Sequence, residues 1–370
     1  MISTVLIYVF VVMAVIQLCY LLTFTSFLFH KTSSKSLNKN LPISVILYAK
    51  NEVYHLNKLI PILQQQEYET YELVLINDAS NDETLEKMKE FEAKDPRIKV
   101  VNVKNNEAFW GNRKYALTLG IKSAKYEQLL FTDADSVPTS KQWIQEMSLL
   151  FSDSKSIILG YVKYESKKYS FFNTIIRYEK LLSTLQYFSF AILKSPYMAD
   201  GKNLAYKKSE FFKVNGFINH IKINSGHDNL FIKDASTSNN TTIVFDPKSH
   251  VICEGPKTLK KWYNQKQNHT KTTSQYKLKH KLLLSVFNSS KLFFLLLIPL
   301  MLLFKSNLYT SAIVLVYFTL NYLVIGYSAK KLKETRLIYF LPLLELFLVL
   351  FQFAIFITNS ISKPRHIGNN

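Results

Sequence analysis

The chain has 370 residues, with 46 Lys and Arg against 27 Asp and Glu, so its formal net charge is +19. Hydrophobic residues make up 48% of it and aromatic residues 14%, with only 9 Gly and 10 Pro. This composition excludes collagen-like, low-complexity and largely disordered chains. The two cysteines, Cys19 and Cys253, provide neither a disulfide framework nor a cysteine-rich zinc site, so a reducing compartment is the simpler location.

The N-terminal segment carries no charged side chain from Ile2 to Phe29. This run is longer than the roughly 20 residues that span a bilayer. It lacks the basic start and the small-residue cleavage site of a secretory signal. We therefore interpret residues 1–29 as an uncleaved transmembrane anchor, followed by a basic linker over residues 30–40.

The middle of the chain, residues 41–255, alternates between strand and helix patterns. We predict strands at Ile43–Tyr48, Glu72–Ile76, Ile98–Val103 and Gln128–Thr132. Residues 56–63 carry Leu and Ile at helical spacing, residues 112–124 are predicted to be helical, and Ser80 and Glu83 have the spacing of a capping box. This alternation predicts an α/β fold with a doubly wound, mostly parallel sheet.

Polar and acidic residues follow three of these strands. They are Lys50, Asn51 and Glu52, then Asn77, Asp78 and Asp82, and finally Asp133 and Asp135. The ligand crevice of such a sheet lies outside the carboxyl ends of its strands, so these side chains should lie together. The glycine fingerprint of dinucleotide-binding folds and the phosphate-binding P-loop are both missing, which argues against Rossmann dehydrogenases and P-loop enzymes.

The strongest single element is Asp133-Ala134-Asp135, directly after an apolar strand. If the extended conformation continues, both carboxylates point to the same face and can reach one site. That site suits Mg²⁺ or Mn²⁺ bound together with phosphate oxygens. The alternative is a solvated loop or the cap of a helix after Pro138. The presence of Asp78 at another strand end favours metal binding.

The C-terminal third is apolar after a basic segment. Residues 256–281 set Trp262 and Tyr263 among lysines, which is typical of a helix at a membrane interface. Within a C-terminal transmembrane region over residues 282–362, the runs 306–329 and 337–362 are long enough to span, and a short tail remains at 363–370. The segment 282–304 is either a third span or re-entrant, because Lys291 interrupts it.

The basic residues indicate an orientation. They flank the first span at Lys31, Lys35 and Lys39, and separate the last two at residues 330–336. By the positive-inside rule both flanks are cytoplasmic, which predicts an integral cell membrane protein with a cytoplasmic middle region. We do not expect nucleic acid as a partner, because the lysines are spread along the chain and no nucleic-acid-binding motif occurs.

Several ordered motifs together indicate a family. They are Ile43–Ile46, Lys50–Glu52, Asn77–Asp82, Gly111–Leu117, Asp133–Asp135, Gly201–Tyr206 and Gly226–Asn229. With them, residues 41–272 resemble the catalytic domain of the family 2 glycosyltransferases. The resemblance implies the GT-A fold, an inverting reaction and a nucleotide-sugar donor. An N-terminal span and a C-terminal cluster of spans also occur in that family.

The resemblance implies roles for the acidic residues. Asp78 would contact the base or ribose of the nucleotide, Asp135 would hold Mg²⁺ or Mn²⁺ on the diphosphate with Asp133 beside it, and Asp228 would be the general base. For Asp228, the alternative is a helix cap.

Other candidate residues are polar or aromatic side chains of the same motifs. For nucleotide binding they are Asn51, Glu52, Arg113, Lys114 and Asp133. Arg113 and Lys114 are candidate phosphate contacts, or else solvated charges at a helix start. Asn203 and Tyr206 could line the acceptor site or support the loop that carries them.

Three positions depart from the family pattern. Asn77 replaces the first acid of a family pair, and His227 stands beside Asp228, whose pKa it could lower when protonated. The family's Q-x-x-R-W signature corresponds best to residues 265–269, where Gln265 is kept and His269 replaces the Trp. Without the Arg and Trp, we expect single transfer rather than processive synthesis, unless a protonated His269 supplies the missing charge near the leaving group.

The function predicted from the sequence is metal-dependent, inverting transfer of a sugar from a nucleoside-diphosphate donor to a hydroxyl. The acceptor would be a lipid or a lipid-linked glycan at the membrane. Two alternatives remain: a catalytically inactive nucleotide-sugar-binding membrane protein, and a transporter with a regulatory cytoplasmic domain.

Overall fold

The computed structural model describes residues 2–31, 40–104, 113–223, 225–304 and 308–361. It divides into two compact units. The sheet unit comprises residues 30–165 and 184–255, and the helical unit comprises residues 1–29, 166–183 and 256–370. We describe each unit by itself.

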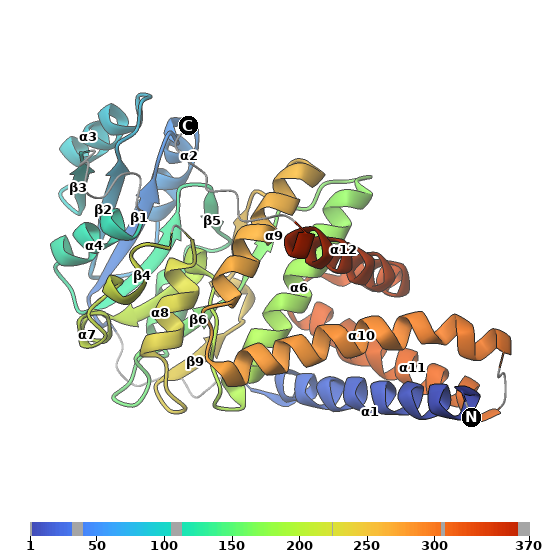
Figure 1. The fold of residues 1–370 in the computed structure, drawn as a ribbon. Helices are drawn as coiled ribbons and strands as arrows, with labels where there is room; N and C mark the ends of the chain where they lie inside the picture. Colours follow the sequence, from blue (N-terminus) through green and yellow to red (C-terminus); the bar gives the residue numbers. More distant parts are fainter. Residues whose placement is uncertain (1, 32–39, 105–112, 224, 305–307, 362–370) are drawn as a thin grey trace. The chain divides into compact units, whose positions relative to one another are not determined.

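The sheet unit is built on a seven-stranded sheet (Figure 1). Its strands are β1 (Ile43–Ala49), β2 (Tyr71–Asp78), β3 (Ile98–Val103), β4 (Gln128–Asp133), β6 (Ile157–Gly160), β8 (Leu204–Lys207) and β9 (Thr241–Val244), in the order β3-β2-β1-β4-β8-β6-β9. Strands β1 to β4 are parallel, and β8 runs antiparallel to both β4 and β6. This confirms the predicted α/β class with a mostly parallel sheet.

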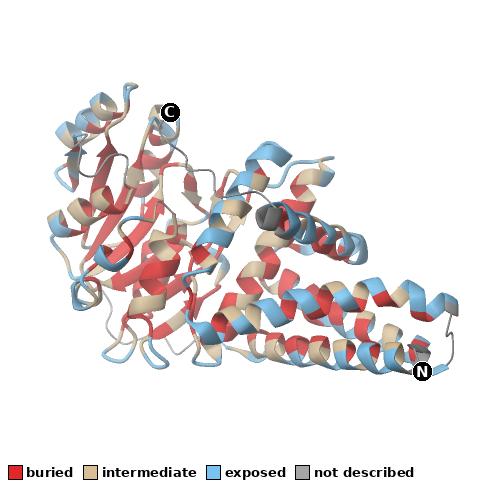
Figure 2. Cartoon of the chain, viewed as in Figure 1, coloured by how far each residue is buried: buried red, intermediate tan, exposed pale blue. Residues whose placement is uncertain are grey.

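Short helices connect the strands. They are α2 (Val53–Gln64), α3 (Thr84–Lys94), α4 (Arg113–Ser123), α5 (Trp143–Ser148), α7 (Lys208–Lys213) and α8 (His227–Ala235), with 3₁₀ turns η2 (Gly201–Asn203), η3 (Ile218–His220) and η4 (Pro247–Ser249). Strands β1 and β2 are buried along almost their whole length (Figure 2), as expected when both faces of a parallel sheet are covered.

The helix after β2 begins later than the sequence suggested. Helix α3 starts at Thr84, and no side chain caps it from its N-cap residue Glu83. The capping box predicted from Ser80 and Glu83 is therefore wrong. The Ser80 hydroxyl instead accepts a hydrogen bond from the backbone N–H of Asn51 at 3.0 Å, which ties the loop after β1 to the loop after β2.

A second, three-stranded sheet was not predicted from the sequence. It contains β5 (Ser136–Pro138), β10 (Val251–Cys253) and β7 (Val162–Tyr164), in the order β5-β10-β7. Strands of three residues are too short to give a periodic pattern. This small sheet fixes the chain directly after Asp135.

The helical unit contains long apolar helices. Its elements are α1 (Ile2–Phe29), the first part of α6 (Phe171–Ile192), α9 (Leu259–Thr273), α10 (Leu278–Phe304), α11 (Leu308–Lys331), η5 (Thr335–Phe340) and α12 (Leu341–Ile361). Four segments within the described residues are long and apolar enough to cross a membrane: Val5–Phe29, Leu278–Leu303, Leu308–Lys331 and Thr335–Ile355. The segment around Lys291 is thus one continuous helix of spanning length.

Contacts between these helices give their relative directions. The Tyr20 hydroxyl of α1 donates to the Leu283 carbonyl of α10 at 2.6 Å, whereas the Phe10 ring lies 5.3 Å from that of Phe294, so the two helices are antiparallel. At the end of α11, the Lys331 ammonium donates to the Phe27 carbonyl at 2.7 Å, which places the C-terminal ends of α1 and α11 together.

The helical unit encloses an ion pair. The Lys291 ammonium of α10 lies 2.8 Å from the Glu345 carboxylate of α12, and both side chains are almost fully buried. The Tyr317 hydroxyl and the Asn321 amide of α11 also donate to this carboxylate, at 2.6 and 2.7 Å. Lys291, which interrupts the apolar sequence, and Glu345 are therefore partners that join three helices.

Candidate active site

The candidate site lies at the carboxyl edge of the larger sheet. The register of β1 with its neighbours pairs Ala49 with Asn77 of β2 and Tyr48 with Asp133 of β4. A pocket at this edge is lined by side chains from β4, α4, α8 and the loop before β8. Among its lining residues are Arg113, Thr132, Asp133, Tyr206, His227 and Asp228. The structure thus brings together strand-end residues that are distant in sequence.

Asp133 and Arg113 form an ion pair in this pocket. The guanidinium of Arg113 also stacks on the ring of Tyr48, 4.2 Å from its centroid. Its Nε atom is buried and has no acceptor among the residues that the structure describes. A buried donor without a partner is costly unless a ligand or water satisfies it, so this nitrogen is suited to an incoming anion.

The two acids of the Asp133-Ala134-Asp135 motif have different partners. The extended conformation ends at Asp133, and Ala134 and Asp135 form a turn, so the argument that both carboxylates share a strand face is wrong. Asp135 is paired with the Lys202 ammonium at 2.5 Å and accepts a hydrogen bond from the Ser136 hydroxyl at 2.8 Å. Its role as a metal ligand stays a prediction.

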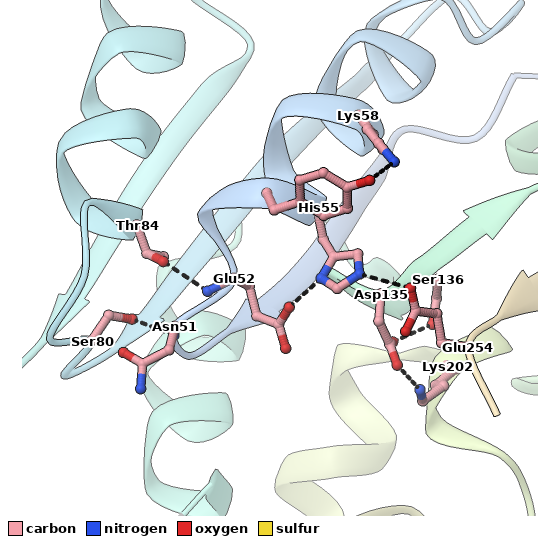
Figure 3. Close-up of polar contacts among 11 residues, drawn as sticks. Asn51, Glu52, His55, Lys58, Ser80, Thr84, Asp135, Ser136, Lys202 and Glu254 are labelled. Carbon is pink, nitrogen blue, oxygen red and sulfur yellow. Dashed lines mark hydrogen bonds and ion pairs between the residues drawn. The ribbon is translucent and has the colours of Figure 1, made fainter. Parts of the chain in front are cut away.

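Beside Asp135, a histidine lies between two carboxylates (Figure 3). His55 of α2 contacts Glu52 at 2.5 Å through Nδ1 and Glu254 at 3.4 Å through Nε2. Glu254 follows β10, whose Cys253 pairs with Ser136 of β5, and this pairing places Glu254 next to Asp135. The small sheet thus adds an acidic residue to the site.

Asn51 and Glu52 also shape the loop after β1. Asn51 has a positive φ of 57° and its side-chain oxygen accepts from the backbone N–H of Asn81 at 2.8 Å, while the backbone N–H of Glu52 donates to the Thr84 hydroxyl at 2.8 Å. Both residues join the ends of β1 and β2 (Figure 3). Contact with a nucleotide stays a prediction for them.

Asp228 lies in the first turn of α8, after Gly226 in the left-handed conformation. Its carboxylate accepts hydrogen bonds from the backbone N–H groups of Gly201 at 2.9 Å and Asn229 at 2.7 Å. A Cβ atom at Gly201 would lie 2.8 Å from His227 Nε2 and 3.2 Å from the Cβ of Asp228, so a larger residue there would displace the His227 ring. The glycine-bearing motif therefore fixes where the proposed base lies.

His227 differs from its sequence-based interpretation. Burial, with Arg113 nearby, lowers the pKa of His227 to about 4. The imidazole is then neutral around pH 7, so it carries no positive charge beside Asp228 at that pH.

Two further candidates, Lys114 and Asn203, are buried and hydrogen-bond to backbone carbonyls of neighbouring segments. The Lys114 ammonium is buried and donates to the carbonyls of His220 at 2.8 Å and Ile223 at 2.5 Å, and burial lowers its pKa to about 8. The buried Asn203 amide accepts from Trp143 Nε1 at 3.0 Å and donates to the Tyr161 and Ser249 carbonyls at 2.9 and 2.8 Å. These contacts favour the supporting alternative for Asn203, and phosphate binding by Lys114 stays a prediction.

The remaining candidates lie in different parts of the chain. Tyr206 forms a wall of the pocket, and its ring lies 4.5 Å from that of Phe131 and 4.3 Å from that of Phe231. Gln265 and His269 belong to α9 in the helical unit, and their roles stay predictions. Gly111 and Asn112, the start of one family motif, lie outside the described residues, as do Lys35, Lys39 and the tail.

Sequence reasoning gave no role to four residues of this edge: Tyr48, His55, Lys202 and Glu254. Tyr48 lies between the motifs Ile43–Ile46 and Lys50–Glu52, and Lys202 lies within the motif Gly201–Tyr206. The hydroxyl of Tyr48 and the positive charge of Lys202, so close to these motifs, are the signals that could have found them. Glu254 could only be found through the short strand that precedes it.

Known proteins match this chain over part of its length. Residues 44–222 match the family described as Glycosyl transferase family 2. An uncharacterized glycosyltransferase of Haemophilus influenzae is 33% identical over 105 residues, which cover 28% of this chain and 31% of that protein. The 4,4'-diaponeurosporenoate glycosyltransferase of Staphylococcus haemolyticus is 39% identical over 93 residues, 25% of this chain and 24% of that protein. The matches thus span a third or less of these relatives.

A solved structure shares the fold over most of the chain. It is the mannosyltransferase PcManGT of Pyrobaculum calidifontis in complex with GDP-Man and Mn²⁺. The TM-score is 0.58 with 13% sequence identity, and the alignment covers 90% of this chain and 99% of that one. At this identity the likeness concerns the fold, and it agrees with the fold expected from the sequence motifs.

Proposed function

Because residues 44–222 are a glycosyl transferase family 2 domain, we propose that the chain transfers a sugar from a nucleoside-diphosphate donor to an acceptor hydroxyl, with inversion at the anomeric carbon. The observation that carries this proposal is the pocket at the carboxyl edge. There Asp228 and the Arg113–Asp133 pair meet, and the buried Nε of Arg113 has no acceptor within the described part of the chain.

The donor would lie along the ends of β1, β2 and β4. Asp78, 4% exposed at the end of β2, would accept hydrogen bonds from the ribose or base, with Lys50 3.9 Å from its carboxylate. Arg113 would bind the diphosphate through its unsatisfied Nε, because planar guanidinium groups match phosphate oxygens.

A divalent metal fits this site. The structure describes no cluster of three or more His, Cys, Asp or Glu residues that could hold an ion alone, but Mg²⁺ typically uses one or two carboxylates together with substrate phosphates. Asp135 and Asp133 offer such oxygens, and Mg²⁺ or Mn²⁺ bound there would stabilise the negative charge of the departing nucleoside diphosphate. Lys202 would then give up its place on Asp135 or share it.

Asp228 would act as the general base. It would take the proton from the acceptor hydroxyl as that oxygen bonds to the anomeric carbon, while the bond from that carbon to the diphosphate oxygen breaks and its electron pair leaves with the nucleotide. The two backbone N–H groups that donate hydrogen bonds to the Asp228 carboxylate hold it in place.

The acceptor would be a lipid or a lipid-linked glycan. Four helices of spanning length support a location in the cell membrane, and the basic flanks support a cytoplasmic sheet unit. With His269 and Asn268 in place of Trp and Arg, we propose a single transfer. A ladder of repeating sugars in the product would contradict that part of the proposal.

The experiment compares Asp228→Asn with Asp234→Asn, which removes an acid from the other end of the same helix α8. The purified protein in nanodiscs is given a panel of UDP- and GDP-sugars with extracted lipids, with Mn²⁺ or with chelator, and release of nucleoside diphosphate is measured. Asp228→Asn should lower kcat by roughly 10²- to 10⁴-fold with unchanged nucleotide affinity, and Asp234→Asn should turn over like wild type.

Three outcomes would contradict the proposal or one of its parts. Nucleotide binding without turnover by wild type would indicate a nucleotide-sugar-binding protein rather than an enzyme. Turnover that persists with chelator would refute the metal, and an Asp228→Asn protein as active as wild type would refute the base.

A further inference from the structure

Tyr48 lies at the centre of the carboxyl edge. Strand β1 lies between β2 and β4, and Tyr48, its penultimate residue, pairs with Ile76 on one side and Asp133 on the other. Its carbonyl accepts a hydrogen bond from the backbone N–H of Ala134 at 3.2 Å. The side chain is half-buried, and its ring contacts Arg113, which lines the pocket.

The hydroxyl of Tyr48 donates to Oδ2 of Asp78 at 2.6 Å. Burial and the hydrogen bond to Asp78 raise the pKa of Tyr48, so the hydroxyl keeps its proton and remains a donor at every physiological pH. An ionised carboxylate has two oxygens with about four acceptor sites. Fixing Oδ2 leaves Oδ1 available to a ligand in a single orientation.

The ring of Tyr48 contacts a second residue, Arg113. The guanidinium of Arg113 lies over its face at 4.2 Å from the centroid and at the same time pairs with Asp133. Stacking fixes the plane of the guanidinium and therefore the direction of the unsatisfied Nε–H. One side chain thus contacts both the acid after β2 and the cation at the start of α4.

We propose that Tyr48 is a positioning residue for the donor, which holds the Asp78 carboxylate and the Arg113 guanidinium at a fixed separation. The inference rests on the proposed function, in which these two groups bind the nucleoside and the diphosphate. The hydroxyl then increases the affinity for the donor, because it orients the Asp78 carboxylate. The ring increases the rate of the chemical step, because it orients Arg113 toward the leaving group.

The chain supplies a matched control at the opposite edge of the same sheet. Tyr71, the first residue of β2, also carries an arginine on its ring, with Arg97 4.8 Å from the centroid. Its hydroxyl donates to the Leu63 carbonyl at 2.9 Å, and Arg97 pairs with Asp95 at 2.8 Å. The residue types match those around Tyr48, but this group lies at the amino edge, away from the candidate site.

The experiment compares Tyr48→Phe with Tyr71→Phe in the full chain, reconstituted in nanodiscs. UDP and GDP binding is measured by calorimetry, and donor KM and kcat are measured from nucleotide release. Tyr48→Phe should raise the nucleotide Kd and the donor KM roughly 3- to 15-fold, the effect of losing one hydrogen bond to a carboxylate, with kcat within twofold of wild type. Tyr71→Phe should change neither constant.

A second pair of variants removes the rings. Tyr48→Leu should lower kcat by about tenfold beyond the Phe variant, because Arg113 loses the surface that fixes its plane. Tyr71→Leu should lower the melting temperature and leave kcat unchanged. Melting temperatures of all four variants show whether folding differs between the pairs.

Three results would overturn the inference. The first is a Tyr48→Phe protein with wild-type Kd and KM. The second is an equal rise in KM for Tyr71→Phe, which would mark a general loss of sheet stability. The third, a wild-type protein that binds no nucleotide and releases none from any donor, would overturn the proposed function itself and the inference with it.

Discussion

The two units use paired charges differently. At the carboxyl edge of the sheet, the Arg113–Asp133 pair is partly exposed, at 27% and 13%, and Arg113 keeps a buried Nε without an acceptor among the described residues. In the helical unit, the Lys291–Glu345 pair is enclosed at 5% and 1%, and two neutral donors complete its carboxylate. A pair with spare bonding capacity is suited to a ligand, whereas a saturated pair holds helices together.

The largest effect is expected in the helical unit. Lys291→Met leaves the Glu345 charge buried without its cation, which should lower the free energy of unfolding by about 3 kcal/mol. The double variant Lys291→Met with Glu345→Met should regain most of this loss, because no charge is then buried alone. The measurement is thermal unfolding in a mild detergent.

The control for this change is Lys279→Met, which removes an exposed lysine near the start of the same helix α10. It should leave the melting temperature within about one degree, since surface substitutions change stability little. If Lys291→Met melts like Lys279→Met, the pair does not hold the helices.

The next largest effect is expected from the Arg113–Asp133 pair at the carboxyl edge. Arg113→Met should lower kcat by about 10²-fold, about 2.7 kcal/mol in the transition state, because a donor aimed at the leaving group is lost. Arg97→Met removes the matched arginine at the amino edge and should lower stability without lowering kcat. Nucleotide release and melting temperature are measured on both proteins. Equal kcat for the two variants would show that Arg113 has only a structural role.

The carboxyl edge of the sheet could be predicted from the sequence because the ends of its apolar strands are easy to recognise. The apolar strands before Asp78 and Asp133, and the parallel connection between them, predict that both acids meet at one edge. The sequence could not show that the chain turns at Ala134 and gives each aspartate its own cation. That turn depends on pairing between β5 and β10, whose residues are more than a hundred positions apart.

The helical unit was predicted from composition rather than from motifs. Long apolar runs identify spans, but a charge inside a run is ambiguous, and Lys291 left its segment open between a span and a re-entrant element. Its partner Glu345 was visible in the sequence as a single interruption of the last run. Only three-dimensional packing shows that the two interruptions neutralise each other.

The Arg97–Asp95 pair of the sheet unit predicts how stability depends on pH. Hydrogen bonds from Arg97 and Gln64 hold the pKa of Asp95 at about 2, although burial opposes them. Because this pKa is below the unfolded value near 3.9, the stabilisation is present above pH 4 and is lost as the pH falls towards 2. It should amount to about 2 kcal/mol.

The measurement is the melting temperature of the sheet unit between pH 2 and pH 5. Asp95→Asn should flatten this part of the stability curve and leave kcat at neutral pH unchanged. A curve that keeps its slope in the Asn variant would assign the acid sensitivity to other carboxylates.

The smallest effect is expected from His227, although it lies beside the proposed base. Burial and Arg113 lower the pKa of His227 to about 4, so the imidazole is neutral from about pH 5 upwards. A neutral side chain places no charge beside Asp228 over that range, and its removal takes away only packing and a weak dipole. His227→Ala should therefore lower kcat by less than about tenfold and leave the shape of the pH–rate profile between pH 5 and pH 8 unchanged. His227→Asn, which keeps a polar group there, should be closer still to wild type. If the wild-type profile has a limb near pH 6.5 that both variants lose, His227 titrates in the working enzyme and the expectation of a neutral imidazole is wrong.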